Sequence, residues 1–216
     1  MDALEAIRER RSARAFKPVP VPRKKIEEIL ELTVNAPSAN NLQPWEFVVV
    51  RDEERERLSR KLLKAYKEKQ ISCGSGASKP LPDAVRKRGL KTLEEMTAFV
   101  AKTGGDVNVF VNEGSCNFYG APVAVIICID DCFSARQFVD VGAAVGYLAL
   151  AAQACGLASC PIGLITDYAE EIKDFLNIPE NKRVVIGVAL GYPDKENPMA
   201  QFRSSRADIK ELVRWF

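Results

Sequence analysis

The sequence predicts an α+β fold, in which helices outnumber strands and do not alternate with them regularly. Three continuous apolar runs have the length and residue types of buried strands, at 47–50, 123–129 and 184–190. Longer segments with the apolar spacing of helices lie between them. Because the sequence contains no Gly-x-Gly-x-x-Gly fingerprint, we do not expect a doubly wound dinucleotide-binding sheet.

The composition is typical of one globular domain that spans residues 1–216, without internal repeats or linkers. The 31 basic and 29 acidic residues leave a net charge of +2, so nothing favours a nucleic acid or a membrane surface as partner. The N-terminus lacks the pattern of a signal peptide, and no apolar run reaches the roughly 20 residues that span a bilayer. We therefore expect a cytoplasmic location.

Apolar spacing predicts the helices one by one. A short helix over 2–9 should turn Leu4 and Ile7 inward. A helix over 134–155 carries alanine and glycine on nearly every face, which indicates close packing on all sides. Further helices are expected at 23–34, 52–70, 82–102 and 168–176.

Two segments do not fit regular elements. Residues 70–118 are rich in small and polar residues at their start, and we interpret the segment as a variable cover over the active site. The tail over 195–216 ends in Leu212-Val213-Arg214-Trp215-Phe216. Since exposure of these apolar groups is unfavourable, the tail should dock, with a partner subunit as one option.

Several catalytic classes are excluded by the residues that are missing. The sequence has no histidine, and its six cysteines form no Cys-x-x-Cys pair. A Ser-His-Asp or Cys-His mechanism is therefore impossible, and no metal site is expected. Reduced thiols, several of them buried, are the simplest interpretation of the cysteines. The chemistry should then belong to a cofactor.

Four short segments are candidates for binding that cofactor. Arg10-Arg11-Ser12-Ala13-Arg14 offers three guanidinium groups and a hydroxyl, which suit a phosphate, although a solvated helix end would look the same. Residues 36–45 place Ser38, Asn41 and Gln43 in a loop before a strand, where they suit a heterocycle's edge or a plain connector.

The other two segments lie later in the chain. Cys160-Pro161-Ile162-Gly163-Leu164 sets a glycine between apolar residues, which suggests close approach of the backbone to a ligand or to another strand. Arg203-Ser204-Ser205-Arg206 in the tail adds a second pair of guanidinium groups. Each segment alone also fits an ordinary surface.

Taken together, the segments resemble the nitroreductase family of FMN-dependent oxidoreductases from end to end. The resemblance rests on their order and spacing, with Gly120-Ala121-Pro122, Asp140-x-Gly142, Gly156-Leu157 and Ala189-Leu190-Gly191-Tyr192-Pro193 between them. It implies a three-layer fold with a central mixed sheet flanked by helices, and an intertwined homodimer. It also implies that bound FMN takes hydride from NAD(P)H and reduces a nitroaromatic, a quinone or a similar planar acceptor in a ping-pong reaction.

The resemblance also implies a role for particular residues. Arg10, Ser12 and a tail arginine (Arg206 or Arg203) would hold the FMN phosphate, and Arg11 would assist. Arg14 would lie near the pyrimidine side of the flavin and stabilise negative charge there. Pro37, Ser38 and Ala39, with Asn41 and Gln43 close by, would come from the other subunit. Pro161, Ile162 and Gly163 would approach the reactive centre, with no acidic residue of the kind found there in some members.

Two alternatives remain open at this point. The first is a specialised relative with the same fold that fragments flavin or removes halogen reductively from aromatic amino acids. The second is a flavin-binding or sensing protein without turnover, because the basic segments explain binding alone.

Overall fold

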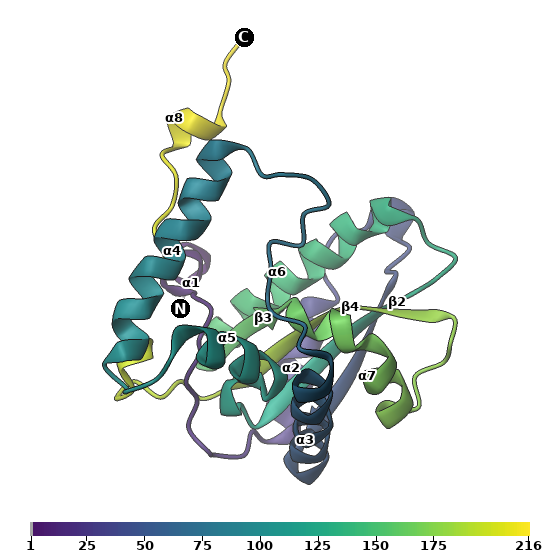
Figure 1. The fold of residues 1–216 in the computed structure, drawn as a ribbon. Coiled ribbons are helices and arrows are strands. Elements are labelled where there is room, and N and C mark those ends of the chain that lie inside the picture. The colour runs from purple at the N-terminus through teal and green to yellow at the C-terminus, as the bar shows by residue number, and fades with distance from the viewer. Residues whose placement is uncertain (1) are drawn as a thin grey trace.

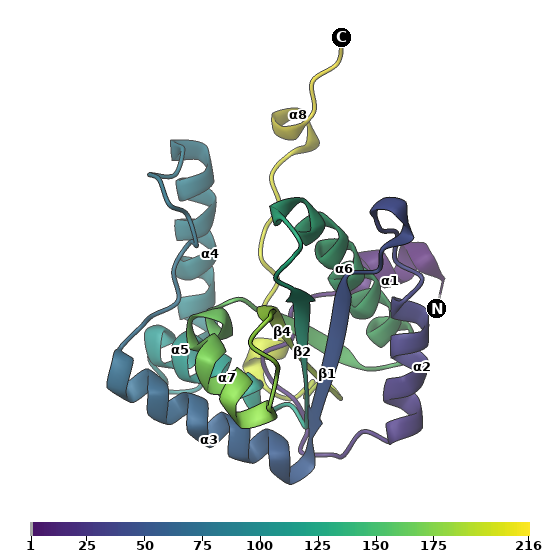
Figure 2. The same cartoon turned by 90° about the vertical axis from the view of Figure 1, so that its right-hand side faces the viewer.

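The computed structural model describes residues 2–216. A sheet lies between two groups of helices, and the C-terminal segment projects away from this body in both views (Figures 1 and 2). The strands are β1 (Trp45–Arg51), β2 (Val123–Asp130), β3 (Ala158–Ile162) and β4 (Lys182–Gly191). The helices are α1 (Ala3–Glu9), α2 (Arg23–Thr33), α3 (Asp52–Lys69), α4 (Asp83–Ala101), α5 (Val107–Cys116), α6 (Phe138–Ala154), α7 (Ala169–Leu176) and α8 (Ile209–Leu212).

The sheet has the strand order β1-β2-β4-β3, and each neighbouring pair is antiparallel. The expected mixed sheet is therefore wrong for these four strands. The only parallel pairing among residues 2–216 is an isolated bridge between Ser12 and Ser159. An apolar run indicates a buried strand but carries no information on its direction, so the sequence pattern could not have settled this point.

Strand β2 forms the centre of the molecule, and all but its last residue are buried. Its side chains alternate between two hydrophobic cores, as the period of two in a strand requires. Ala124, Ile126 and Cys128 pack with α3, α5 and α7. The intervening residues pack with α2 and α6. Both faces of the sheet are covered, which confirms the three layers (Figure 2).

Two elements were missed, and one local expectation was wrong. The edge strand β3 was missed because it is short and contains Pro161, which only an edge strand tolerates. Helix α5 was missed although Asp106 caps it by accepting from the N–H groups of Asn108 and Val109. Leu4 and Ile7 do not face inward, since they are 63% and 58% exposed on α1.

The last residue of β4 is a tight contact point between segments far apart in sequence. A Cβ on Gly191 would lie 2.6 Å from Cδ of Pro122 and 3.2 Å from Cδ1 of Phe16. We therefore expect Gly191→Ala to lower the free energy of unfolding by roughly 1–3 kcal/mol through overpacking. Urea denaturation measures this loss.

A matched control exists in α4. A Cβ on Gly89 would meet nothing within 4 Å, and alanine favours a helix interior by up to about 1 kcal/mol over glycine. Gly89→Ala should therefore be at least as stable as the parent protein. Equal stability of the Gly191→Ala protein and the parent would contradict the tight packing.

Candidate active site

The basic segment that follows α1 runs along the edge of the sheet. Helix α1 ends at Glu9, and the backbone of the next residue, Arg10 (φ −60°, ψ 134°), leaves the helical conformation. The N–H of Ala13 then donates to the carbonyl of Ser159 in β3 at 3.0 Å. Since β3 is an edge strand, this bond fixes the segment beside the sheet.

A cavity of about 860 Å³ opens beside this segment, within the range of roughly 300–1,000 Å³ that small-molecule sites occupy. Six arginines line it, and no carboxylate of residues 2–216 does. Its walls come from α1 and the basic segment, from α4, from α6, from β3 and from the tail. They include Arg8, Arg10, Arg11, Ser12, Arg14, Thr92, Gly142, Val145, Gly146, Ala149, Pro161, Phe202, Arg203, Ser204 and Arg206. Such a cavity suits an anionic ligand.

The tail brings its arginines to this cavity from nearly 200 residues away. Nη2 of Arg203 pairs with the Glu9 carboxylate at 3.0 Å. Arg206 instead donates to its own segment, with Nη1 2.7 Å from Oγ of Ser204 and 2.9 Å from the Ser204 carbonyl. Burial, and then the charge of Arg203, lower the pKa of Arg11. The guanidinium groups are thus crowded together with little compensation from acids.

One wall of the cavity is smooth because α6 presents small residues there. A Cβ on Gly142 or on Gly146 would meet nothing within 4 Å. Ala149 continues the same wall one turn later. The small residues of this helix therefore leave open space here, while Val141, Ala144 and Leu148 pack in the core. The expected close packing on all sides is wrong within this chain, since Val139 is 75% exposed.

A second cavity of about 400 Å³ adjoins the first, and Arg14, Thr92 and Pro161 line both. Ile162 and Gly163 lie in its wall, and the space above Gly163 is open, since a Cβ there would meet nothing within 4 Å. The rest of the lining comes from the segment after α3, from α4, from α5 and from the turn that follows α5; it includes Ser72, Cys73, Gly89, Leu93, Met96, Asn108, Val111, Asn112, Ser115 and Tyr119.

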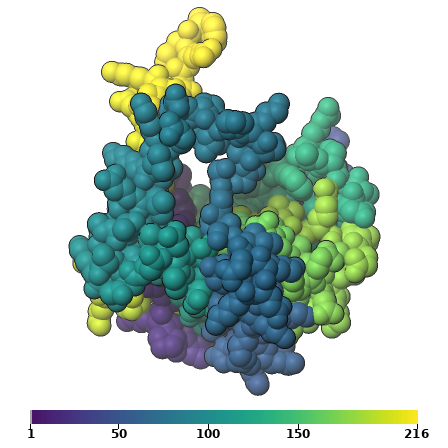
Figure 3. Space-filling model, in the orientation of Figure 1, coloured from purple at the N-terminus to yellow at the C-terminus, as the bar shows by residue number. Residues whose placement is uncertain are grey.

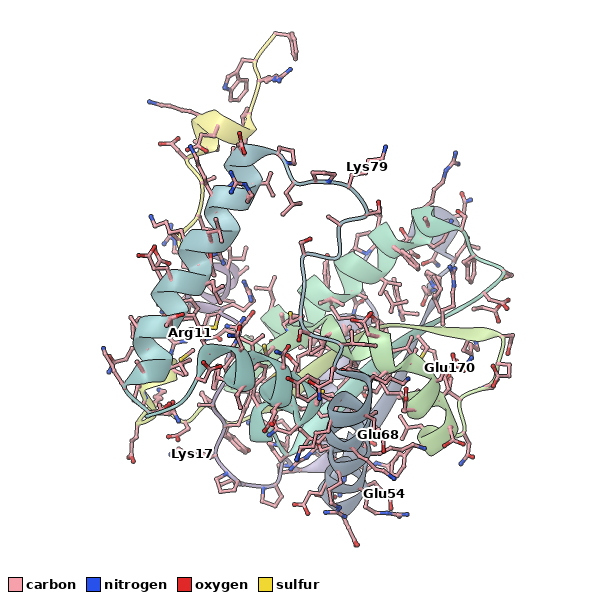
Figure 4. All side chains as sticks on the ribbon, viewed as in Figure 1. Arg11, Lys17, Glu54, Glu68, Lys79 and Glu170 are labelled. Atoms are coloured by element: carbon pink, nitrogen blue, oxygen red, sulfur yellow. The ribbon has the colours of Figure 1, made fainter. Side chains whose placement is uncertain are left out.

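The start of this part of the lining is fixed by two long-range hydrogen bonds. The hydroxyl of Tyr168 donates to the Ile71 carbonyl at 2.8 Å, and the Cys73 N–H donates to Oδ1 of Asn112 at 2.7 Å. Beyond this point the chain arches away from the body before α4 begins (Figure 3). Figure 4 shows Lys79 on this arch and Arg11 among the crowded side chains beside α4.

The structure does not bring the loop of residues 37–43 to either cavity. This loop precedes β1, which is one edge of the sheet, whereas both cavities adjoin β3 at the other edge. Three strand spacings of about 4.8 Å each separate the two edges. Within the loop, Asn41 and Gln43 have left-handed backbones (φ 55° and 46°), and the Gln43 N–H donates to Oγ of Ser38.

The other predicted residues do meet in space. Arg10, Arg11, Ser12, Arg14, Pro161, Arg203 and Arg206 line the first cavity, and Ile162 and Gly163 the second. Sequence reasoning did not assign a role to Arg8, which lies two residues before Arg10, or to Ser204, which lies between the two tail arginines. It also missed Asn112, in the region left unassigned, and Tyr119, just after it. The Asp106 cap could have located α5 and thereby Asn112.

Metal-binding clusters and membrane-spanning helices are absent from the described residues. Over residues 2–216, no group of three or more histidine, cysteine, aspartate or glutamate side chains is placed to hold a metal ion. In the same range, no helix combines the length and apolarity needed to cross a membrane. Cys116, Cys128 and Cys160 are buried free thiols, and burial raises the pKa of Cys116 to about 12.

Known proteins with this architecture are numerous. The nitroreductase NfnB of Mycolicibacterium smegmatis is 31% identical over 212 residues, which cover 97% of this chain and 90% of that protein. A 4-nitrobenzoate reductase of Pseudomonas putida is 31% identical over 199 residues, covering 91% and 88%. The crystal structure of the FMN-dependent nitroreductase NfnB from Mycobacterium smegmatis, in complex with NADPH, matches with a TM-score of 0.89 at 30% identity and covers 99% of this chain and 98% of that one.

The family model described as the nitroreductase family matches residues 7–192. This range contains the basic segment after α1, all four strands and the strip from Pro161 to Gly163. The agreement of motifs, fold and cavity has one explanation: the chain belongs to the nitroreductase family.

Proposed function

We propose that this protein is an FMN-dependent oxidoreductase that uses NAD(P)H to reduce nitroaromatics, quinones or similar small planar acceptors. The observation that carries the proposal is the cavity lined by six arginines and no carboxylate, joined to a second cavity that a substrate can enter. FMN, when bound, supplies the hydride and electron chemistry that the side chains lack. The FMN-dependent relative solved with NADPH supports the same cofactor and donor.

The residues present fit this cofactor. Arg10 and Ser12 with Arg206 or Arg203 would hold the phosphate through charge-assisted hydrogen bonds, and Arg11 would add charge. Nε of Arg14 is buried and has no hydrogen-bond partner among residues 2–216. Such a donor normally finds a partner, and a ligand between the two cavities would provide one. The open space above Gly163 leaves room for a planar ring near Pro161 and Ile162.

The proposal includes a homodimer in which each site is shared. Residues 37–43 lie at the far edge of the sheet, so Pro37, Ser38, Ala39, Asn41 and Gln43 would complete the site of a second copy. Exposed apolar side chains on α1, on α6 and in the tail support a dimer, because burying them is favourable; they are Leu4, Ile7, Val139, Leu212, Trp215 and Phe216.

The proposal also assigns a role to residues 70–118 within one domain of residues 1–216. These residues supply most of the wall of the second cavity that faces Gly163. As a cover over the site, they would exclude water and select the acceptor. The chain's own residues otherwise bind and orient, and protons come from solvent.

An anaerobic titration of the FMN-loaded protein with NADPH, and then with NADH, tests the proposed function. We expect flavin absorbance to bleach, and to return when menadione or a nitroaromatic is added. The more effective nicotinamide identifies the donor. Protein that binds no FMN would overturn the whole proposal, whereas bound flavin that neither nicotinamide reduces would overturn the reductase alone.

A substitution at Gly163 makes this test specific to the site. The backbone of Gly163 (φ −77°, ψ −36°) suits any residue, and a Cβ there meets nothing. Gly163→Leu should therefore fold normally while it narrows the ring site, and we expect weaker FMN binding and slower bleaching. Unchanged flavin binding and reduction would contradict the position given to the ring.

A further inference from the structure

The turn between α5 and β2 has an unusual backbone. Three successive residues, Phe118, Tyr119 and Gly120, have positive φ angles of 56°, 52° and 73°. Only glycine adopts this conformation easily, and an aromatic residue is held there only when its surroundings fix it. Two glycines would make the same turn without strain. The turn itself does not require Phe118 and Tyr119, so their aromatic side chains must serve a role in packing or binding.

The surroundings of Tyr119 hold its ring firmly. A Cβ on Gly114 would lie only 2.5 Å from Cε1 of the ring, so glycine is required beneath it. The Phe110 ring lies beside it with centroids 5.5 Å apart, and Oγ of Ser115 is 3.3 Å from the Tyr119 hydroxyl. Helix α5 thus fixes the ring in the wall of the second cavity.

Arg14 lies over the face of this ring, with its guanidinium carbon 5.8 Å from the centroid. This distance is typical of a cation–π interaction. Nη1 of Arg14 also donates to the Ser12 carbonyl at 3.3 Å, which is a long hydrogen bond. No acidic side chain in that range pairs with it. The ring of Tyr119 is therefore the principal support of this cation.

The choice of an aromatic partner has a chemical consequence. A carboxylate beside Arg14 would orient the guanidinium but would also neutralise it. The face of a phenol ring orients the cation and leaves its full charge available to a ligand. Since burial raises the pKa of Tyr119, the phenol stays neutral and introduces no competing negative charge.

We propose that Tyr119 is a positioning residue of the flavin site, which holds Arg14 where the two cavities meet and thereby raises the reduction potential of bound FMN. The inference rests on the proposed function, because it requires FMN beside Arg14. A cation fixed at the place where negative charge develops favours reduction. Without the ring, Arg14 would move toward solvent and this help would be lost.

The test compares midpoint potentials of FMN-loaded variants, measured anaerobically by equilibration with redox dyes. Tyr119→Phe keeps the ring face and should retain the parent potential. Tyr119→Leu should shift it by about −30 mV, the tenfold change in equilibrium constant of a two-electron couple. In an Arg14→Ala background, Tyr119→Leu should cause no further shift, because the two residues act as one unit.

Tyr192→Leu is the matched control, because it removes a similar pair, in which Lys25 lies 5.5 Å from the Tyr192 centroid outside both cavities. Its potential should equal that of the parent. A Tyr119→Leu protein with bound FMN and the parent potential would overturn the inference. If the leucine variant does not fold, Tyr119→Met replaces it: a lowered potential supports the inference, and the parent potential overturns it. Failure of the parent to bind FMN would instead overturn the proposed function.

Discussion

Protein that carries Arg10→Ala is expected to lose most of its FMN during purification, with a dissociation constant raised roughly 10–100-fold. A hydrogen bond between charged groups contributes about 1.5–3 kcal/mol, and each 1.4 kcal/mol is about a factor of ten. Arg10 lines the cavity, and no carboxylate of residues 2–216 lines it. The loss of Arg10 therefore removes a phosphate donor and leaves no unpaired acid that could change the effect. Titration of the apoprotein with FMN, followed by flavin fluorescence, measures the loss.

Riboflavin makes this measurement specific to the phosphate. It lacks the phosphate, so Arg10→Ala should affect its binding far less than that of FMN. Arg60→Ala is the control, because Arg60 lies on α3 outside both cavities and its nearest carboxylate oxygen, on Glu56, is 3.9 Å away. Equal losses of affinity for FMN and riboflavin would show that Arg10 acts on something other than the phosphate.

The same titration decides between the two tail arginines. Arg203 is already paired with Glu9, whereas Arg206 donates only to Ser204 and Ser205 of its own segment. We therefore expect Arg206→Ala to weaken FMN binding more than Arg203→Ala. The opposite order would assign the phosphate to Arg203.

Mixed dimers of two inactive variants are expected to recover activity. Arg10→Glu places a carboxylate in the phosphate cavity of one chain, and Ala39→Trp places a bulky ring in the exposed loop before β1 of the other. In a two-fold dimer with shared sites, a mixed dimer has one intact site and one doubly altered site. Random association then restores about a quarter of the sites.

Co-expression with two different affinity tags isolates the mixed dimers, and NADPH oxidation measures their activity. Each variant alone provides the baseline, and both must form dimers of normal size. Recovery far above this baseline supports a site built from two chains. If the mixed dimers are as inactive as each variant alone, the loop of one chain does not complete the phosphate cavity of the other.

Much of the fold could be predicted because its strongest signals are local. The apolar run of β2 requires burial on both faces, and the structure buries it between the two cores. Strand direction and the edge strand β3 could not be predicted, because they depend on pairing with residues distant in sequence, such as Trp45 with Ile129 or Ala158 with Gly191. Leu4 and Ile7 mislead for a different reason, since apolar spacing defines one face of a helix but does not show that this face is buried within the chain.

Some residues of the candidate site could be predicted from the sequence and others could not. Arginines separated by nearly 200 residues were predicted to meet because their motifs resemble a known family, and the structure brings them together. Tyr119 was missed because no sequence pattern predicts a left-handed aromatic residue. Its role depends on Gly114, Phe110 and Arg14 in three dimensions. The contribution of residues 37–43 stays a prediction, since they lie at the opposite edge of the sheet.

The two hydrogen bonds that fix Ile71 and Cys73 affect which insertions and deletions this fold tolerates during evolution. They hold the chain at the point where it leaves the body, so the arch over 74–82 begins from a fixed anchor whatever its length. Insertions and deletions there need not disturb the arginines, which belong to other segments. Residues 74–82 line neither cavity, so we expect arches of other lengths to be tolerated without loss of the arginine-lined cavity.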